Sequence, residues 1–174
     1  MCLKRRTKVE RKSKIDYYLD IALTVAQRST CLRKCYGAII VKNDEIISTG
    51  YNGAPRGRKN CTDLNFCIRE SMKIPSGERY ELCRSVHSEM NAIISASRES
   101  MLGSDLYLAC FDPKTGKEIY NTCSCSMCKR HIINAGIKTV YVRSESGQYI
   151  AYDTNAWIEN DDSLTGNTRY METK

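Results

Sequence analysis

Apolar and polar positions follow helical and strand-like periods along much of the chain. Over residues 13–28, apolar side chains recur every three or four positions, which predicts an amphipathic helix. Two β-rich runs follow, residues 38–41 and 46–49, on either side of a polar Asn-Asp pair at positions 43–44. Short polar turns of this kind join antiparallel strands, so the two runs predict a β-hairpin.

The second half of the chain alternates helical and strand patterns. Residues 52–85 show no clean period and hold two of the three prolines, so no regular element is predicted there. A helix is expected after His87, a buried strand over residues 105–110, a helix that ends at Gly136, and a strand over residues 138–144. The order αββαβαβ predicts an α/β fold, a three-layer sandwich with a partly parallel sheet.

Length and composition are those of one enzyme-sized domain. The 174 residues fit a single domain over residues 15–174, preceded by a flexible basic tail, residues 1–14, which carries much of the formal charge of +7. Neither a signal peptide nor a bilayer-spanning run is recognisable, so we expect a cytoplasmic protein with no membrane partner. In such a chain ten cysteines point to metal ligands, catalytic thiols or buried core residues rather than disulfides.

A histidine and a glutamate stand two residues apart in "CRSVHSEMNAII", at the start of a predicted helix. Side chains two positions apart in mid-helix point about 200° apart, so His87 and Glu89 could not face one point there. In a first turn they can, because His87 leaves from the cap and Glu89 leans back toward the N-terminus. We therefore expect this pair to converge at the beginning of the helix.

Two cysteines three residues apart open the next predicted helix, in "CSCSMCKRH". Cys125 and Cys128 share a helix face and can clamp one metal ion together with His87. One nitrogen and two thiolates leave the fourth tetrahedral position of Zn²⁺ open for water, as in catalytic zinc sites, with Glu89 beside the metal as a proton carrier. Either motif alone says little, but together they predict a catalytic zinc site. His131 is expected at or near the surface.

The two motifs resemble those of the zinc-dependent cytidine and deoxycytidylate (dCMP) deaminase superfamily, whose His-x-Glu and Pro-Cys-x-x-Cys patterns correspond to "HSE" and "SCSMC". Three longer stretches, "STCLRKCYGAIIVKNDEIISTGYNGAPRG", "CRSVHSEMNAII" and "IINAGIKTVYV", are similar to the dCMP deaminase family, including bacterial proteins of the ComE operon type. The family's proline is replaced by Ser124, and Cys123 is a further thiol beside the pair. The implied fold is a cytidine deaminase-like α/β/α sandwich, a mixed central sheet flanked by helices.

The resemblance implies a role for each residue of the two motifs. His87, Cys125 and Cys128 would hold the catalytic Zn²⁺, and Glu89 would shuttle protons. The implied reaction is hydrolytic deamination of dCMP to dUMP and ammonia, in which zinc-activated water attacks C4 of cytosine after giving a proton to the glutamate. The chain would then be a hydrolase of pyrimidine deoxynucleotide metabolism that acts on a cyclic amidine.

Substrate contacts are expected from the loop "GYNGAPRG". The resemblance places Asn52 where it would hydrogen-bond the nucleotide, whereas an Asn-Gly dipeptide is also a common turn. Arg56 and Arg58 would meet the 5′-phosphate, or they are solvated loop arginines. Both interpretations stay open at this point.

Four other cysteines suggest a second metal. Cys61, Cys67 and Cys83 lie in the irregular segment and Cys31 lies just before the hairpin, so a structural zinc bound by these four thiolates would tie this segment down. Some dCMP deaminases carry a second, structural zinc. The alternative is four buried thiols that behave as small hydrophobic residues.

Three functions remain to be separated. The favoured one is a dCMP deaminase, for which the family implies a cyclic homo-oligomer, often a hexamer, and dCTP and dTTP as effectors. A polynucleotide base deaminase similar to tRNA adenosine deaminases would use the positive charge for phosphate contacts, but the loop "GYNGAPRG" and the stretch "STCLR" disfavour a nucleic-acid substrate. A non-catalytic zinc-binding module is the third, and the presence of Glu89, which is not a ligand, argues against it.

Overall fold

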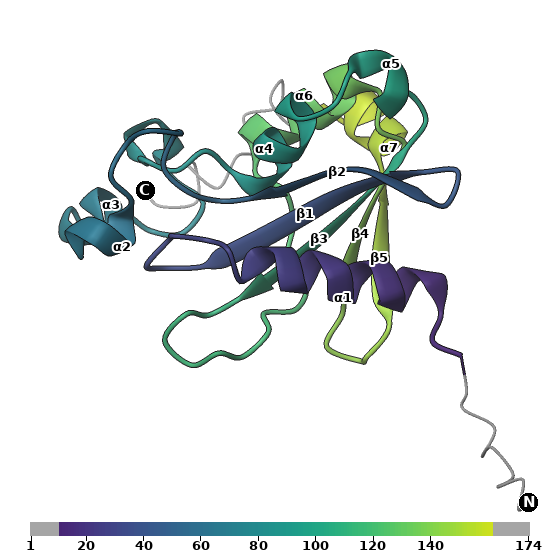
Figure 1. Ribbon diagram of the computed structural model, residues 1–174. Coiled ribbons are helices and arrows are strands. Elements are labelled where there is room, and N and C mark those ends of the chain that lie inside the picture. Colours follow the sequence, from purple (N-terminus) through teal and green to yellow (C-terminus); the bar gives the residue numbers. More distant parts are fainter. Residues whose placement is uncertain (1–10, 162–174) are drawn as a thin grey trace, which may run out of the picture.

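The computed structural model describes residues 11–161. A five-stranded sheet with the order β2-β1-β3-β4-β5 lies between two layers of helices (Figure 1). Its strands are β1 (Cys35–Lys42), β2 (Glu45–Tyr51), β3 (Asp105–Phe111), β4 (Thr139–Arg143) and β5 (Tyr149–Asp153). Strands β3 and β4 are parallel, and the other neighbouring pairs are antiparallel. The predicted α/β sandwich with a mixed sheet is therefore confirmed.

Helices cover both faces of the sheet. The described residues form α1 (Lys14–Ala26), α2 (Cys61–Leu64), α3 (Ile68–Ser71), α4 (Ser88–Ile94), α5 (Arg98–Met101), α6 (Ser126–Ala135), α7 (Thr154–Glu159) and a 3₁₀ turn, η1 (Tyr80–Leu82). Helix α1 lies on one face, α4 to α7 lie on the other, and α2 and α3 extend beyond one end of the sheet (Figure 1). Among the described helices, none combines the length and the apolar character that crossing a membrane requires.

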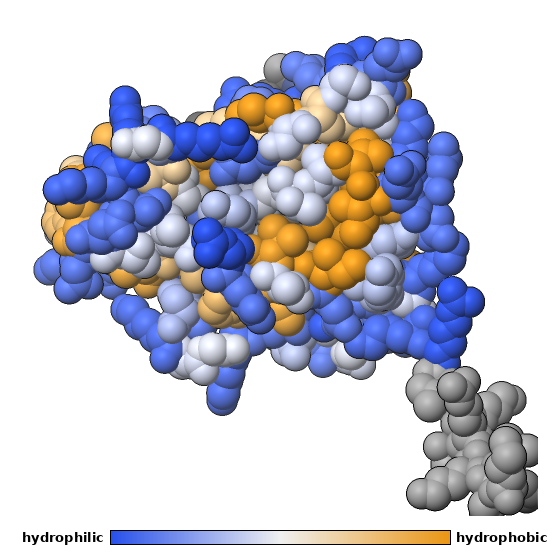
Figure 2. Space-filling model, in the orientation of Figure 1, coloured by the Kyte–Doolittle hydropathy of each residue, from blue (hydrophilic) through white to orange (hydrophobic). Residues whose placement is uncertain are grey.

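The core has two parts because both faces of the central strands are buried. Successive side chains of a strand point to opposite faces, so Ala38 and Ile40 of β1 pack under α4 and α6, while Ile39 and Val41 pack under α1. The continuous apolar runs of β1 and β3 follow from this double burial. The edge strand β2 is different: Ile46 and Tyr51 are exposed, and an apolar area lies over this edge of the sheet (Figure 2).

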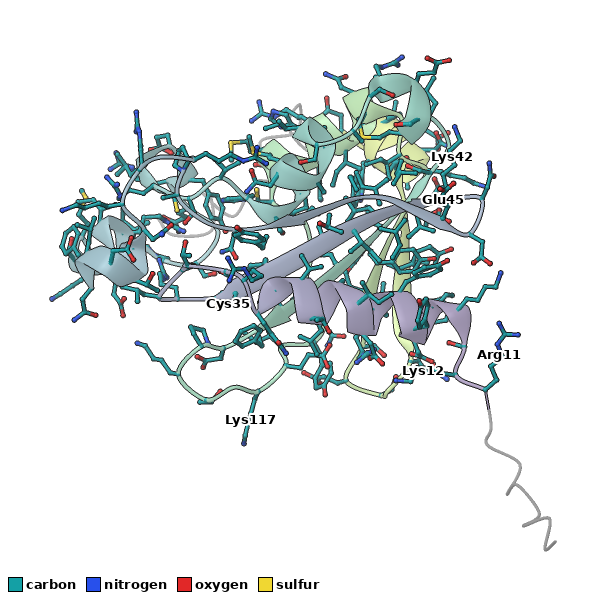
Figure 3. The ribbon with its side chains drawn as sticks, viewed as in Figure 1. Arg11, Lys12, Cys35, Lys42, Glu45 and Lys117 are labelled. Carbon is teal, nitrogen blue, oxygen red and sulfur yellow. The ribbon has the colours of Figure 1, made fainter. Side chains whose placement is uncertain are left out.

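The predicted hairpin and helix ends are present. Asn43 and Asp44 have φ values of 52° and 67°, as a tight two-residue turn between β1 and β2 requires. The turn, flanked by Lys42 and Glu45, lies at the opposite end of β1 from Cys35 (Figure 3). Helix α1 begins at Lys14, so one residue of the segment predicted as a tail is helical. Residues 1–10 of that segment lie outside the described residues.

Several short elements were not predicted. Helices α2, α3 and α5 have four residues each and η1 has three, which is less than the length over which a helical period can be recognised. Strand β5 is an edge strand with alternating exposure and ends the sheet. Helix α7 follows it directly. The predicted order αββαβαβ is thus correct as far as β4 but omits these elements.

Helix α4 is seated on β2 at a glycine. A Cβ atom at Gly50 would lie 2.3 Å from both the amide nitrogen of Ala92 and the carbonyl oxygen of Ser88. Real Cβ atoms do not approach backbone so closely, so only glycine lets the helix lie at this distance from the strand. This contact fixes the position of the helix whose first turn carries His87 and Glu89.

Candidate active site

The His-x-Glu motif begins α4. His87 is the N-cap residue, with extended backbone (φ −71°, ψ 155°), and Glu89 lies in the first turn. Glu89 is buried, with 5% of its surface exposed. The Ser88 hydroxyl donates a hydrogen bond of 2.9 Å to Glu89 Oε2. The first turn therefore presents the imidazole and an oriented carboxyl on one side, as the spacing predicted.

The Cys-x-x-Cys motif begins α6 in the same way. Cys125 is its N-cap residue, and Cys128 is fully buried in the first turn. The Nδ1 atom of His87 lies 3.5 Å from Cys125 Sγ and 3.3 Å from Cys128 Sγ. The metal-binding atoms of these three side chains all lie within 4.8 Å of one another. Within residues 11–161, no other group of three or more His, Cys, Asp or Glu side chains is as compact.

The donor set fits a zinc ion. Tetrahedral Zn²⁺ with Zn–N and Zn–S bonds of about 2.0 and 2.3 Å would separate its nitrogen and sulfur ligands by about 3.5 Å. The observed separations of 3.5 and 3.3 Å agree with this geometry. One imidazole and two thiols are also the ligand types that zinc prefers. Three protein ligands leave one coordination position for water or substrate.

Electrostatics prepare these groups for a cation. Hydrogen bonding to Cys128 lowers the pKa of Cys125 to about 4 against the opposing effect of burial, and the neighbouring His87 adds to the lowering. Hydrogen bonding to Cys125, burial and the charge of Glu89 together raise the pKa of Cys128. Burial lowers the pKa of His87, but Cys125 and Glu89 outweigh it and raise that pKa overall. The lowered pKa of Cys125 favours its thiolate, which is the form that binds a metal ion.

The cluster opens into a cavity of about 340 Å³, a size suited to a small molecule. His87, Glu89 and Cys125 line it together with Asn52. The Asn52 side chain accepts hydrogen bonds from the Tyr36 amide (2.8 Å) and the Ser29 hydroxyl (2.6 Å), and it donates one to the Lys34 carbonyl (2.9 Å). Asn52 therefore braces the segment that leads into β1. Its contact with substrate stays a prediction.

Arginines of the same loop lie elsewhere. Arg56 and Arg58 are exposed and do not line the cavity. Their predicted contact with a phosphate is therefore not supported by their position and awaits a test. His131 is exposed on α6, where its Nδ1 lies 2.7 Å from the Met127 carbonyl oxygen.

Cys123 and Ser124 precede the cysteine pair. Cys123 lines the cavity but is not a member of the three-residue group. The residue is exposed. Ser124, at the position of the family's proline, is buried, and its hydroxyl has no hydrogen-bond partner among the described residues.

The four cysteines predicted to bind a structural zinc lie around one cavity, but their sulfurs do not form a compact group. Cys31, Cys61, Cys67 and Cys83 all line the same cavity. Burial raises the pKa of Cys61, and electrostatic interaction with the other three thiols raises it further. Among the described residues, however, no three of these sulfurs lie within 4.8 Å of one another. The structure therefore places these cysteines around one cavity without a compact group of three sulfurs.

Two cavity residues have no signal in the sequence. The Tyr80 ring meets the His87 ring edge-on, with centroids 4.7 Å apart. The Arg69 guanidinium lies over the Tyr80 ring, with Cζ 4.4 Å from its centroid. Both come from the irregular segment 52–85, where neither a period nor a motif spacing marks them.

Comparison with known proteins agrees with this geometry. The family model described as the cytidine and deoxycytidylate deaminase zinc-binding region matches residues 12–144. Deoxycytidylate deaminase of Mycobacterium phage D29 is 35% identical over 136 residues, which cover 75% of this chain and 94% of that protein. ComE operon protein 2 of Bacillus subtilis is 35% identical over 134 residues, 76% of this chain and 60% of that protein.

Other relatives are longer than the matched region. Deoxycytidylate deaminase of Schizosaccharomyces pombe is 34% identical over 125 residues, which cover 72% of this chain but only 35% of that protein. The crystal structure of dCMP deaminase from cyanophage S-TIM5 in complex with dCMP and dUMP superposes with a TM-score of 0.51 at 29% identity, covering 75% of this chain and 82% of that one.

Proposed function

The chain belongs to the cytidine and deoxycytidylate deaminase family, and from this membership we propose that it catalyses the zinc-dependent hydrolysis of dCMP to dUMP and ammonia. One observation carries the proposal: His87, Cys125 and Cys128 form a three-donor group beside a buried carboxyl that is not part of that group. A purely structural metal has no use for such a carboxyl, whereas hydrolysis needs a proton carrier. Relatives named deoxycytidylate deaminase support the choice of substrate.

Each residue has a separate task in this reaction. His87, Cys125 and Cys128 would hold Zn²⁺, which when bound supplies a Lewis acid that makes water reactive near neutral pH. Glu89 takes one proton from the attacking water and delivers it to N3 of cytosine. It then takes the second proton of that water from the hydroxyl on C4 and delivers it to the amino group, which leaves as ammonia while C4–O becomes a carbonyl. The Ser88 hydroxyl, 2.9 Å from Glu89 Oε2, orients this carboxyl. The cavity walls would hold the cytosine base with C4 next to Glu89 and the zinc ligands, so that these proton transfers occur over short distances.

A substrate panel tests the proposed function. The purified zinc-loaded protein would be assayed for ammonia release with dCMP, CMP, deoxycytidine and an adenosine-containing tRNA stem-loop. We expect dCMP to be deaminated with the highest kcat/KM. Reaction of the stem-loop alone would instead assign the chain to polynucleotide base deamination, and no reaction with any cytosine compound would contradict the proposal.

A second, structural zinc bound by Cys31, Cys61, Cys67 and Cys83 stays a separate proposal. The four thiols line one cavity, which supports it. Four thiolates around one zinc ion lie within about 4 Å of one another, so these sulfurs would have to come closer together when the metal binds. Metal analysis of the wild-type chain decides this question.

Assembly, regulation and location are proposed from the family resemblance. We expect a homo-oligomer, in particular a hexamer, that is activated by dCTP, inhibited by dTTP and found in the cytoplasm. The exposed apolar residues Ile46 and Tyr51 on the edge strand β2 support self-association. Light scattering of the purified protein and turnover measured with added dCTP or dTTP test the first two expectations.

A further inference from the structure

The His87 imidazole meets the two sulfurs through one of its nitrogens. Nδ1 lies 3.5 Å from Cys125 Sγ and 3.3 Å from Cys128 Sγ. A histidine that binds a metal almost always donates a hydrogen bond from its other nitrogen, and that bond fixes the orientation of the ring. Within residues 11–161, no protein group accepts such a bond from Nε2 of His87. The protein therefore fixes the plane of this ring through packing contacts.

The Tyr80 ring makes the aromatic contact with the imidazole. The two ring centroids are 4.7 Å apart, and the ring planes are at 84° to each other. An edge-on contact depends on the angle between the planes, so rotation of the imidazole about its Cβ–Cγ bond would lose it. Because Nδ1 moves with the same rotation, the contact also determines the direction in which Nδ1 points.

Arg69 in turn holds Tyr80. Its guanidinium lies over the Tyr80 ring, with Cζ 4.4 Å from the centroid, an arrangement that the negative face of the ring favours. Nη2 of the same group donates hydrogen bonds to the carbonyl oxygens of Pro75 (2.9 Å) and Glu78 (2.6 Å). Tyr80 follows these residues directly, as the first residue of η1. Arg69 is only 6% exposed, so it braces both the ring and the backbone that leads to it.

We propose that Tyr80, braced by Arg69, is a positioning residue for the zinc ligand His87. The Tyr80 ring keeps the imidazole in the orientation that points Nδ1 at the metal position between the two cysteine sulfurs. This inference rests on the proposed function, because it assigns Tyr80 and Arg69 to the same zinc site. The irregular segment 52–85 then contributes to the metal affinity of a site whose ligands all lie on helix starts.

Two simpler roles for Tyr80 would give different results. Tyr80 lines the cavity, and a ring that only contacted the substrate would change KM without a change in metal affinity measured in the absence of substrate. A ring that only filled space would affect Tm and leave the zinc affinity of the folded protein unchanged. Only a ring that orients His87 links the side chain at position 80 to zinc binding.

The test measures zinc affinity of purified full-length variants by competition with a chromophoric chelator, without substrate. For Tyr80→Leu, we expect the dissociation constant of the catalytic zinc to rise about tenfold to a hundredfold, the range for loss of a partner that orients a metal ligand. Tyr80→Phe keeps the ring and should stay within about threefold of the wild type. Arg69→Gln keeps the ring but removes its brace, so its effect should be smaller than that of Tyr80→Leu. Zinc that His87→Ala still binds belongs to other sites and is subtracted.

Cobalt provides a second readout of the same site. The visible absorption bands of Co²⁺ bound in place of zinc depend on the arrangement of its ligands. Tyr80→Leu should shift or broaden these bands, whereas Tyr80→Phe should leave them unchanged. Excess zinc should also restore part of the turnover that Tyr80→Leu loses, which it could not do if the loss came from a missing substrate contact.

A control variant separates zinc affinity from general stability. Tyr107→Leu removes a buried ring that packs with Tyr18 and Tyr141 on the opposite face of the sheet, so it should lower Tm without a change in zinc affinity. A zinc dissociation constant of Tyr80→Leu within about twofold of the wild type would overturn the proposal. So would an equal rise in Tyr107→Leu, or a loss in Tyr80→Phe as large as that in Tyr80→Leu.

Failure of the proposed function has a different signature. A wild-type protein that binds zinc but deaminates no cytosine compound would contradict the proposed function. A zinc affinity that still depended on the ring at position 80 would in that case uphold the role of Tyr80.

Discussion

Two groups of cysteines in this chain differ in the kind of backbone that carries them: one lies at the start of a helix packed on the sheet, and the other lies on loops and short helices. Cys125 and Cys128 come from the first turn of α6 and meet His87 at the start of α4, with Nδ1 to sulfur separations of 3.5 and 3.3 Å. Cys31, Cys61, Cys67 and Cys83 come from loops and from the ends of short helices, and they share only a cavity. A metal site that is built on the starts of packed helices is held in place by the sheet, whereas one built on irregular chain depends on the metal itself for its geometry.

The largest expected effect concerns the group on the helix starts. Glu89→Gln keeps the size of the side chain but removes the proton acceptor, so turnover of dCMP should fall by about 10² to 10⁴ or more, the range for general acid-base catalysis. Zinc content and dCMP affinity should stay close to those of the wild type, because ligands and cavity are unchanged. Steady-state kinetics, metal analysis and equilibrium binding check this, and turnover within about tenfold of the wild type would refute the role of Glu89.

The second prediction addresses the group on irregular chain. If those four cysteines bind a structural zinc, the wild-type chain should contain two zinc ions and Cys61→Ser only one, with a lower Tm because metal binding is coupled to folding. Cys110→Ser, at another buried cysteine, is the control, since it should affect Tm without a change in metal content. One zinc ion per wild-type chain would show that the four thiols do not bind a metal.

A third change tests whether the packing of α4 fixes the catalytic group. Gly50→Ala places a Cβ 2.3 Å from backbone atoms of Ala92 and Ser88, so the helix must move away from β2. Overpacking of this kind costs about 1 to 3 kcal/mol of stability, and turnover should fall because His87 and Glu89 move with the helix. Denaturant unfolding and kinetics check it. Thr49→Ala, at an exposed position of the same strand, is the control. Equal losses of stability and turnover in the two variants would contradict the role of Gly50 in positioning α4.

The smallest expected effect lies on the opposite face of the sheet, away from both cysteine groups. Burial, then the hydrogen bond and charge of Asp44, raises the pKa of Tyr18 to about 12. The unfolded chain would release this proton near pH 10, so the stabilising contribution is complete below that pH and is lost as pH rises from about 10 to about 12. Unfolding free energies of wild type and Tyr18→Phe across this range should converge as the pH rises. A constant difference would contradict the assignment.

Regular elements with local signals could be predicted from the sequence. The period of α1, the Asn43-Asp44 turn and the glycine that ends α6 each depend on a few neighbouring residues. Strand β5 has only five residues, and neither its apolar nor its polar positions alternate along them, so no strand period marks it. Helix α5 has only four residues, too few for a period.

The same distinction applies to the candidate site. His87, Glu89, Cys125 and Cys128 could be predicted to converge, because fixed offsets at helix starts determine where side chains point. Tyr80 and Arg69 could not, because they reach the cavity through a segment whose path depends on tertiary contacts such as the bonds from Arg69 to Pro75 and Glu78. The position of Arg56 depends on tertiary contacts in the same way. The sequence predicts it at a phosphate, whereas the residue does not line the cavity.

The most direct test of the catalytic group is the zinc content and dCMP turnover of His87→Ala. Removal of one of three protein ligands should release one zinc ion per chain relative to the wild type and abolish turnover, while any zinc bound by the other cysteines remains. The variant should still fold, because His87 is not one of the residues that form the core between the sheet, α4 and α6. An unchanged zinc content, or turnover that persists without the imidazole, would contradict the assignment of His87, Cys125 and Cys128 as the catalytic zinc site.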